Sequence, residues 1–410
     1  MKYSLSLALL STVLGAPRLQ ATALLQKAVI DSAHQVDDLS FEVSQATVGR
    51  SYSGKNFSIK RQQLKGGLQD GTTLLTVDNG ALKIVLIPSR GMGILDVVAD
   101  GHVRYGWDSP IKEVVHPKFI NLHDRGGLGW LEGFNEFLVR CGVEYAGSPG
   151  VDKFINNRGK EDSSVLTLHG RIANIPASKV EVLVEDGTPA TIRVRGEVRE
   201  LTFLGPKLIL TTELVTQVGS SSFEVHDTIT NVGSGDQEYQ LVYHTNFGKP
   251  LLEAGAQFVA PVKSLQPREP MQPDALERYT TYQGPTPRFV EEVFFMTPYA
   301  NAEGVTKVGL TNRDKSLGAS LSFPIEHLPY LSLWKNTASV EDGYVTGIEP
   351  GTSYPNNRSV ERAAGRVPVL KAGESVGLSI KFSFHTTPES VATMIREVEA
   401  IKDGRATEMK

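Results

Sequence analysis

The chain has 410 residues, 40% hydrophobic and 21% charged, a composition typical of a globular protein with a large buried core. Its 42 basic and 46 acidic residues are interspersed and give a formal net charge of −4. No basic stripe or polybasic tail is present, which argues against nucleic acid or an anionic membrane as a partner.

Cys141 is the only cysteine, so a disulfide or a cysteine-based zinc site within one chain is excluded. A lone thiol could act as a nucleophile, but residues 138–142 have the composition of a buried strand. Free cysteines usually behave as small core residues, and we therefore predict a buried, unreactive Cys141.

At the N-terminus, Lys2 precedes an apolar run at residues 5–16, and Ala21-Thr22-Ala23 follows. A positive charge, a short apolar segment and a small-residue cleavage site are typical of a secretory signal. The run is shorter than the roughly 20 residues that span a bilayer, and no later stretch is long and apolar enough. We expect residues 1–23 to be a signal peptide and the protein to be periplasmic or secreted; the alternative is a buried N-terminal helix.

The next residues in the chain, 24–30, are predicted to form a short helix within an N-terminal extension at residues 24–63. Apolar and polar residues then alternate with a period of two, which is typical of antiparallel sheets with one buried face. The clearest runs are residues 82–86, 192–198, 223–229 and 376–384. Turn dipeptides such as Asn79-Gly80 and Asp186-Gly187 separate the runs.

Convincing helical patterning occurs only near the C-terminus. Thr387 can cap a helix, Pro388 suits its first turn, and an apolar stripe follows at Val391, Met394, Ile395 and Val398. No repeat, low-complexity tract or linker interrupts the chain. We therefore predict one all-β domain at residues 64–386, followed by a C-terminal helix and tail at residues 387–410.

Three segments combine apolar strand patterning with residues capable of acid–base chemistry. They end in His169-Gly170-Arg171, in Tyr243-His244-Thr245-Asn246 and in Glu349-Pro350-Gly351-Thr352. Burial raises the pKa of a glutamate and lowers that of a histidine, so both move towards neutrality. Each segment also has a purely structural explanation, as a hydrogen-bonded core histidine or a turn-forming acid. No metal-binding histidine pattern, phosphate-binding glycine loop or nucleophile elbow is present.

The order of these segments resembles the aldose 1-epimerase (galactose mutarotase) superfamily. More narrowly, the chain is similar to an uncharacterised branch of that superfamily over residues 64–384. Five short motifs carry the resemblance: Arg90-Gly91-Met92, Gly129-Trp130-Leu131, Arg140-Cys141-Gly142, His169-Gly170-Arg171 and Glu349-Pro350-Gly351-Thr352. The family's Asn-Arg pair is replaced by Val139-Arg140, a departure that puts galactose itself in doubt as the substrate.

The resemblance implies an all-β galactose-mutarotase-like supersandwich with a short C-terminal helix. It matches Glu349 to the family's general base and His244 to its general acid, with His169 as the second histidine of the pocket. Arg140 falls where the family places a sugar-binding arginine. The expected substrate-binding set is His169, Arg140, Arg171, Arg90, Asn246 and Trp334, with Trp107 and Trp130 as further candidates for stacking on a sugar.

The implied activity is anomer interconversion by acid–base ring opening on a small carbohydrate, which requires no cofactor, and no residue is assigned to a metal. We expect a monomer or a homodimer. Two other functions fit the same fold: a lyase or hydrolase acting on a glycoside or oxidised sugar, and a non-catalytic carbohydrate-binding protein.

Overall fold

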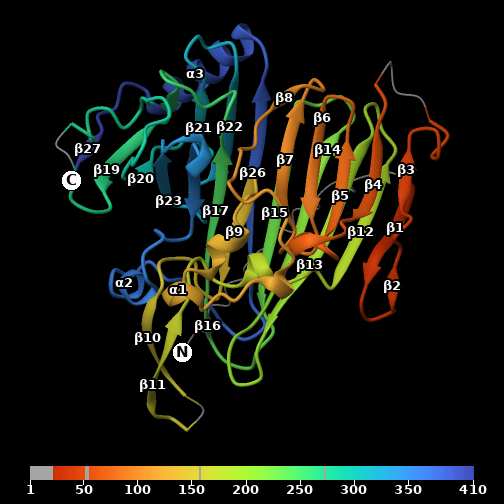
Figure 1. Cartoon of the computed structure of the whole chain (residues 1–410), viewed down its shortest axis with the longest axis horizontal. Coiled ribbons are helices and arrows are strands. Elements are labelled where there is room, and N and C mark those ends of the chain that lie inside the picture. The colour runs from red at the N-terminus through yellow and green to blue at the C-terminus, as the bar shows by residue number, and fades with distance from the viewer. Residues whose placement is uncertain (1–21, 51–54, 157, 272–273) are drawn as a thin grey trace, which may run out of the picture.

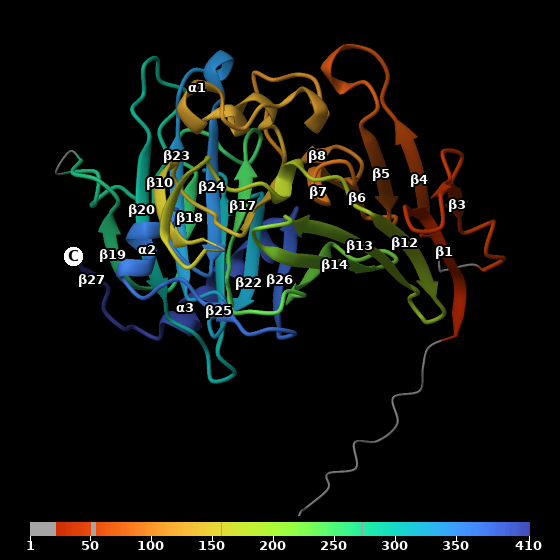
Figure 2. The same ribbon diagram turned by 90° about the horizontal axis from the view of Figure 1, so that it is seen from below.

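The computed structural model describes residues 22–410 except 51–54, 157 and 272–273. The dominant elements are the strands of two large sheets that pack face to face, so the predicted all-β architecture is confirmed. The N-terminal strands lie at one end of the molecule, and β19 and β20 lie at the other (Figures 1 and 2). Residues 1–21 of the expected signal peptide fall outside the described residues.

The first sheet has ten strands, and each pairs antiparallel with its neighbour. Its order is β18 (Gln257–Val259), β21 (Val305–Thr311), β22 (Gly318–Pro324), β26 (Ser375–His385), β15 (Ser222–Asn231), β14 (Lys207–Gln217), β13 (Thr191–Leu201), β12 (Lys179–Glu185), β1 (Ala23–Asp31) and β2 (Val36–Asp37).

The second sheet has thirteen strands and carries the site described below. Its order is β27 (Glu408–Met409), β19 (Val262–Pro267), β20 (Glu292–Pro298), β23 (Tyr330–Asn336), β24 (Val345–Gly351), β17 (Gln240–Phe247), β9 (Leu138–Val143), β7 (Gly93–Ala99), β6 (Leu82–Ile87), β5 (Thr73–Asp78), β4 (Ser58–Gln63) and β3 (Glu42–Ser44), with β8 (Val103–Arg104) paired to β7.

Two small sheets and three α-helices complete the fold within the described residues. The hairpin of β10 (Gly150–Ile155) and β11 (Glu161–Leu166) extends from the body beside α1 (Asp124–Gly127) and α2 (Arg358–Ala363), as Figure 1 shows. The other small sheet pairs β16 (Gln237–Glu238) with β25 (Val369–Leu370). The five 3₁₀ turns are Gly67–Gln69, Pro117–Phe119, Gly129–Gly133, Ile172–Asn174 and Val340–Asp342.

The strands predicted from alternation are present with the expected faces buried. In β6, Leu82, Ile84 and Leu86 are buried while Lys83 is exposed. One apolar core fills the space between the two sheets and draws on both of them. Such a core stabilises the sandwich by removing apolar surface from water.

The predicted helix at residues 24–30 is wrong, because these residues form strand β1. β1 pairs with β12 along the edge of the first sheet, and β3 and β4 continue the second sheet. The segment predicted as an N-terminal extension, residues 24–63, therefore supplies strands to both large sheets. Cross-strand pairing overrides the weak helical propensity of so short a segment.

The C-terminal helix is confirmed as α3 (Pro388–Lys402). Thr387 and Ser390 form a reciprocal capping box, and Val391, Met394 and Val398 are buried. No helix in the described part of the chain has the length and apolarity needed to cross a membrane.

Candidate active site

A cavity of about 690 Å³ lies on the face of the second sheet that turns away from the first. Strand alternation in β17 fixes this orientation. Tyr243 points to the first sheet and donates to Asp227 of β15 at 2.9 Å, so the next residue, His244, points the opposite way and lines the cavity.

Four neighbouring strands form the floor of the cavity: β17 provides His244, β24 provides Val345 and Glu349, β23 provides Trp334 and Asn336, and β20 provides Val293. Loop segments form the walls. They are Arg125 in α1 and Leu128 directly after it, Trp130, Leu131 and Phe134 in and after the 3₁₀ turn at Gly129–Gly133, and Ser148, Pro149, Leu168 and His169 around the hairpin.

His244 and Glu349 meet at the floor of this cavity. His244 Nε2 lies 3.2 Å from Glu349 Oε1, and the two residues are only 5% and 3% exposed. The contact is not aligned as a hydrogen bond, and Oε1 has no hydrogen-bond partner among the described residues. Two titratable groups from different strands are thus in contact and almost completely buried.

Burial shifts both groups towards their neutral forms. Desolvation, together with the nearby charge of Glu291, raises the pKa of Glu349 to about 8, while Arg268 acts in the opposite direction. Desolvation and the neighbouring His169 hold the pKa of His244 well below its usual value of 6.5. Groups with shifts of this kind in a cavity are candidates for acid–base catalysis.

Asn246 does not line the cavity but holds His244 from behind. His244 Nδ1 donates to Asn246 Oδ1 at 2.7 Å. The amide nitrogen of Asn246 donates in turn to the carbonyl oxygens of Glu136 at 3.0 Å and of His244 at 3.3 Å. The predicted substrate-binding role of Asn246 is therefore corrected to support of the His244 ring.

His169 lines the cavity as the sequence predicted, next to the pair. Its ring centroid lies 5.5 Å from that of His244 and 4.7 Å from Trp130. Its Nδ1 donates to the carbonyl of Ala146 at 3.0 Å, and burial lowers its pKa to about 4. His169 has a φ of 59°, a left-handed conformation that costs energy in a non-glycine residue.

All three tryptophans border the cavity. Trp334 donates its indole N–H to Glu291 Oε2 at 2.7 Å, and Trp107 donates to the carbonyl of Glu136 at 3.0 Å. Phe134 packs between Trp107 and Trp130 with ring centroids 4.9 and 4.7 Å away. The walls of the cavity are thus largely aromatic.

Arg140 is placed elsewhere, and its predicted sugar-binding role is wrong. It lies opposite Tyr243 in the β9–β17 register and therefore faces the first sheet. Its guanidinium donates to both carboxylate oxygens of Asp227, at 2.5 and 2.9 Å, and also to the Met92 carbonyl and the Thr212 hydroxyl. Arg140 is thus half of a buried structural ion pair between the sheets.

Arg90 also lies in the protein interior and does not line the cavity. Its fully buried guanidinium lies 2.8 Å from Glu136 Oε1 and donates to the carbonyl of Gly133. Gly133 ends the 3₁₀ turn that carries Trp130. Arg90 therefore supports a wall of the cavity from behind and does not line it.

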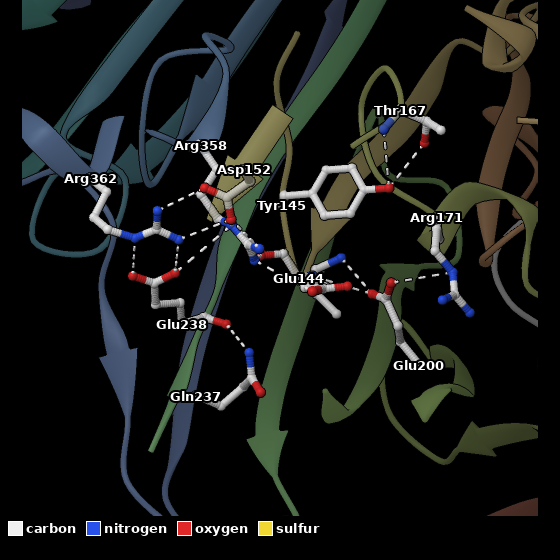
Figure 3. A network of polar contacts seen from close by, with 11 residues as sticks. Glu144, Tyr145, Asp152, Thr167, Arg171, Glu200, Gln237, Glu238, Arg358 and Arg362 are labelled. Carbon is white, nitrogen blue, oxygen red and sulfur yellow. Dashed lines mark hydrogen bonds and ion pairs between the residues drawn. The ribbon is translucent and has the colours of Figure 1, made fainter. Parts of the chain in front are cut away.

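Arg171 does not line the cavity, and its Nε lies 3.8 Å from the buried carboxylate of Glu200 (Figure 3). Glu200 Oε2 accepts from the backbone N–H groups of Val143 at 2.9 Å and Glu144 at 3.3 Å. Burial and the nearby charge of Glu144 raise the pKa of Glu200 to about 7. The pair braces the loop that presents His169, so Arg171 is not a ligand contact either.

Sequence reasoning missed four charged residues that line the cavity: Arg125, Arg268, Glu291 and Asp342. Arg125 lies in α1 at a left-handed φ of 53°, and the others lie in a 3₁₀ turn or just outside strands, where side-chain direction follows no period that could have revealed them. A signal existed for Gly347, because a glycine inside an apolar strand often marks a close approach. A Cβ there would lie 2.6 Å from Glu349 Oε1 and 3.1 Å from His244 Cε1.

Cys141 is buried as predicted, and burial raises its pKa well above the usual range. No group of three or more histidine, cysteine, aspartate or glutamate side chains in the described residues is arranged to hold a metal ion.

Two face-to-face sheets, with an aromatic-lined cavity and a buried His–Glu pair on one of them, define a galactose-mutarotase-like protein with a carbohydrate-epimerase-like fold. The chain belongs to the family described as a domain of unknown function (DUF4432), which matches residues 69–384. No curated protein matches the chain.

Solved structures agree with this assignment. A "putative aldose 1-epimerase" from Klebsiella pneumoniae subsp. pneumoniae MGH 78578 is 40% identical, with a TM-score of 0.88 over 94% of this chain and 98% of that one. A galactose mutarotase-like protein from Clostridium acetobutylicum is 14% identical, with a TM-score of 0.54 over 80% of this chain and 98% of that one. The galactose 1-epimerase from Lactobacillus acidophilus NCFM is 12% identical, with a TM-score of 0.52 over 80% and 99%. The last two share the fold.

Proposed function

We propose that the cavity binds a sugar and that His244 and Glu349 interconvert its anomers by acid–base ring opening. The observation that carries the proposal is the contact between these two buried groups, 3.2 Å apart on the floor of an aromatic-lined cavity. One group takes the proton of the anomeric hydroxyl while the other protonates the ring oxygen. The C1–O5 bond then breaks, C1 rotates, and the reverse transfers close the ring on its other face.

The rest of the cavity suits a polyhydroxylated ring. The half-buried Trp334 offers a flat apolar face for stacking, while Arg268, Glu291 and Asp342 offer hydrogen bonds to hydroxyl groups. Held in this way, a sugar would place its anomeric and ring oxygens near the pair, and such positioning contributes strongly to rate.

NMR exchange spectroscopy on a panel of reducing sugars tests the proposal. The protein should exchange the two anomers of at least one sugar faster than the spontaneous rate. Glu349→Gln keeps the shape of the side chain but cannot carry the proton, so turnover should fall by roughly 10²-fold or more while binding survives. Glu303→Gln, which alters an exposed acid outside the cavity, is the matched control. Turnover unchanged in Glu349→Gln on a confirmed substrate would refute the mechanism.

A second candidate, cleavage of a glycoside by a lyase or hydrolase reaction, draws support from the size of the cavity. The volume of about 690 Å³ falls within the range of about 300–1,000 Å³ typical of pockets that bury drug-sized ligands, so a second ring or an aglycone fits beside one sugar ring. The same NMR experiment, run with glycosides, separates the candidates: new products identify cleavage, and tight binding with neither exchange nor products identifies a carbohydrate-binding protein.

We further propose that the protein works outside the cytoplasm, as the charge, apolar run and small residues at positions 1–23 suggest. N-terminal sequencing of the protein from its native host should find a mature chain that begins near Leu24. An intact Met1 on cytoplasmic protein would contradict the proposal.

A further inference from the structure

Arg268 lines the cavity, and its positive charge has no carboxylate within hydrogen-bond distance. It follows β19, and its backbone N–H donates to the carbonyl of Val293 in β20 at 2.9 Å, which fixes it beside the cavity floor. Its guanidinium donates to the hydroxyl of Ser148 at 3.2 Å. The nearest carboxylate oxygen in the described part of the chain belongs to the exposed Glu269, 3.7 Å away. Most of the five N–H donors of this guanidinium therefore have no partner among the described residues.

Other arginines of low exposure are paired with acids. Arg90, Arg140 and Arg358 lie 2.8, 2.5 and 2.6 Å from a carboxylate oxygen. Arg268 is only 29% exposed and has lost much of its hydration, but it has no such counter-charge. Because it borders a cavity that a ligand can enter, an anionic group of the ligand can supply the missing partner.

The charge of Arg268 acts on the cavity floor and on the wall next to it. Burial is the main cause of the low pKa of His169, and the charge of Arg268 lowers that pKa further. At Glu349, burial and Glu291 raise the pKa, and the charge of Arg268 acts in the opposite direction. Arg268 is thus close enough to influence groups on both sides of the place where a sugar would bind.

The acids of the cavity leave this charge unpaired. Of the described acids that line the cavity, Glu291, Asp342 and Glu349, none forms an ion pair with Arg268. Glu291 instead accepts the indole N–H of Trp334 at 2.7 Å.

A second cation borders the same wall. Arg125 in α1 is exposed and lines the cavity, and its side chain has no hydrogen-bond or ion-pair partner among the residues that the structure describes. The segment at residues 148–149 lies between the two arginines. Its Ser148 accepts from Arg268, and a Cβ added to Gly127 of α1 would lie 3.0 Å from Cβ of Pro149. This wall of the cavity therefore carries positive charge.

We propose that Arg268 binds a carboxylate of the substrate and that the substrate is a sugar acid with its carboxylate on C5, a hexuronic acid. This inference rests on the proposed sugar-binding function of the cavity. A carboxylate matches the planar fork of a guanidinium through two parallel hydrogen bonds. A neutral hydroxyl group would leave the guanidinium without a counter-charge.

The position of the carboxylate in the sugar suits this role. In a hexuronic acid, C5 carries both the ring oxygen and the carboxylate carbon, C6. A ring oxygen that lies at His244 and Glu349 therefore brings the carboxylate next to the pair. That is the part of the cavity where the charge of Arg268 acts on Glu349.

Isothermal titration calorimetry at pH 7 with the wild-type protein tests the substrate class. The probes are D-glucuronate and D-galacturonate, their methyl esters, and glucose and galactose. At least one uronate should bind roughly 10- to 100-fold more tightly than its methyl ester and its hexose, the usual contribution of hydrogen bonds to a charged group. Added salt should reduce the difference.

Three results of this experiment would overturn the proposal. They are equal affinity for a uronate, its methyl ester and the hexose, binding of a hexose but of no uronate, and tighter binding of hexose 6-phosphates than of uronates. Binding of a uronate without anomer exchange would contradict the proposed enzyme activity and support the sugar-acid inference, so the two failures are distinguishable.

Variants of Arg268 test the residue itself. Arg268→Met should lower the affinity for the uronate by roughly 10- to 100-fold and leave that for the methyl ester nearly unchanged. Arg268→Lys keeps the charge without the planar fork and should restore part of the affinity. Arg396→Met, which alters an exposed arginine of α3 outside the cavity, is the matched control and should bind as the wild type does. Equal losses of affinity for the uronate and its methyl ester in Arg268→Met would contradict the assignment.

Discussion

Replacement of Arg140 by methionine gives a direct test of how the interior of the sandwich is held together. The substitution keeps the aliphatic stem but removes a guanidinium that donates to Asp227, Thr212 and the carbonyl of Met92. Asp227 would keep only the hydroxyl of Tyr243 as a donor. A buried carboxylate would then lie between two sheets without its counter-charge.

The size of the effect follows from this burial. Removal of one partner of a buried ion pair costs about 3–5 kcal/mol, because the remaining charge is left uncompensated. Unfolding entropy of about 2.1 cal/mol/K per residue gives roughly 0.9 kcal/mol/K for a chain of this length, so Tm should fall by about 4–6 °C. Affinity for a confirmed sugar should be unchanged, since Arg140 does not line the cavity.

Differential scanning calorimetry and sugar titration of Arg140→Met measure the two quantities. Asp227→Asn in the same chain should restore part of the lost stability, because it removes the unpaired charge. Lys153→Met breaks an exposed pair with Glu161 at 2.9 Å and should leave Tm unchanged. An unchanged Tm in Arg140→Met together with weakened sugar binding would refute the structural role and support a sugar-binding role for Arg140.

Three further predictions concern other parts of the molecule. Gly347→Ala should displace the Glu349 carboxyl group and reduce kcat strongly. If the spectra of the variant show a normally folded protein, the loss of kcat does not come from misfolding. The pKa of Glu200 is about 7 in the folded protein against an ordinary 4.5, so the free energy of unfolding should fall by about 3 kcal/mol as pH rises from about 4.5 to 7. In urea titrations, Glu200→Gln should make the free energy of unfolding less dependent on pH over this range. Thr387→Ala removes the cap of α3 and should cost about 1 kcal/mol in the same assay.

The sequence was informative wherever one face of a strand meets water. In β6 and β13, alternation of polar and apolar residues revealed both the strand and its buried face. Every residue of β9 and of β17 is buried, so alternation disappears there and the direction of Arg140 could not be read. Only the partner strand, through the pairing of Tyr243 with Arg140, fixes that direction.

Some residues of the candidate site could likewise be predicted from the sequence, and others could not. His169, His244, Glu349 and Trp334 were predicted, and all four line the cavity. The resemblance located the first three by motif order, which needs no knowledge of geometry. Residues such as Arg268 reach the cavity only because separate strands and loops meet in space, and no local pattern in the chain records that meeting.

The cavity floor and the cavity walls come from different kinds of backbone, and this has consequences for how the protein can diversify. His244 and Glu349 are fixed in the ladder of β17 and β24, where a one-residue insertion would turn every side chain to the opposite face. The 3₁₀ turn at Gly129–Gly133 and the segment at residues 148–149 are loops, which tolerate changes in length and composition. Remodelling of these loops can therefore change the shape of the cavity while His244 and Glu349 keep their positions on its floor.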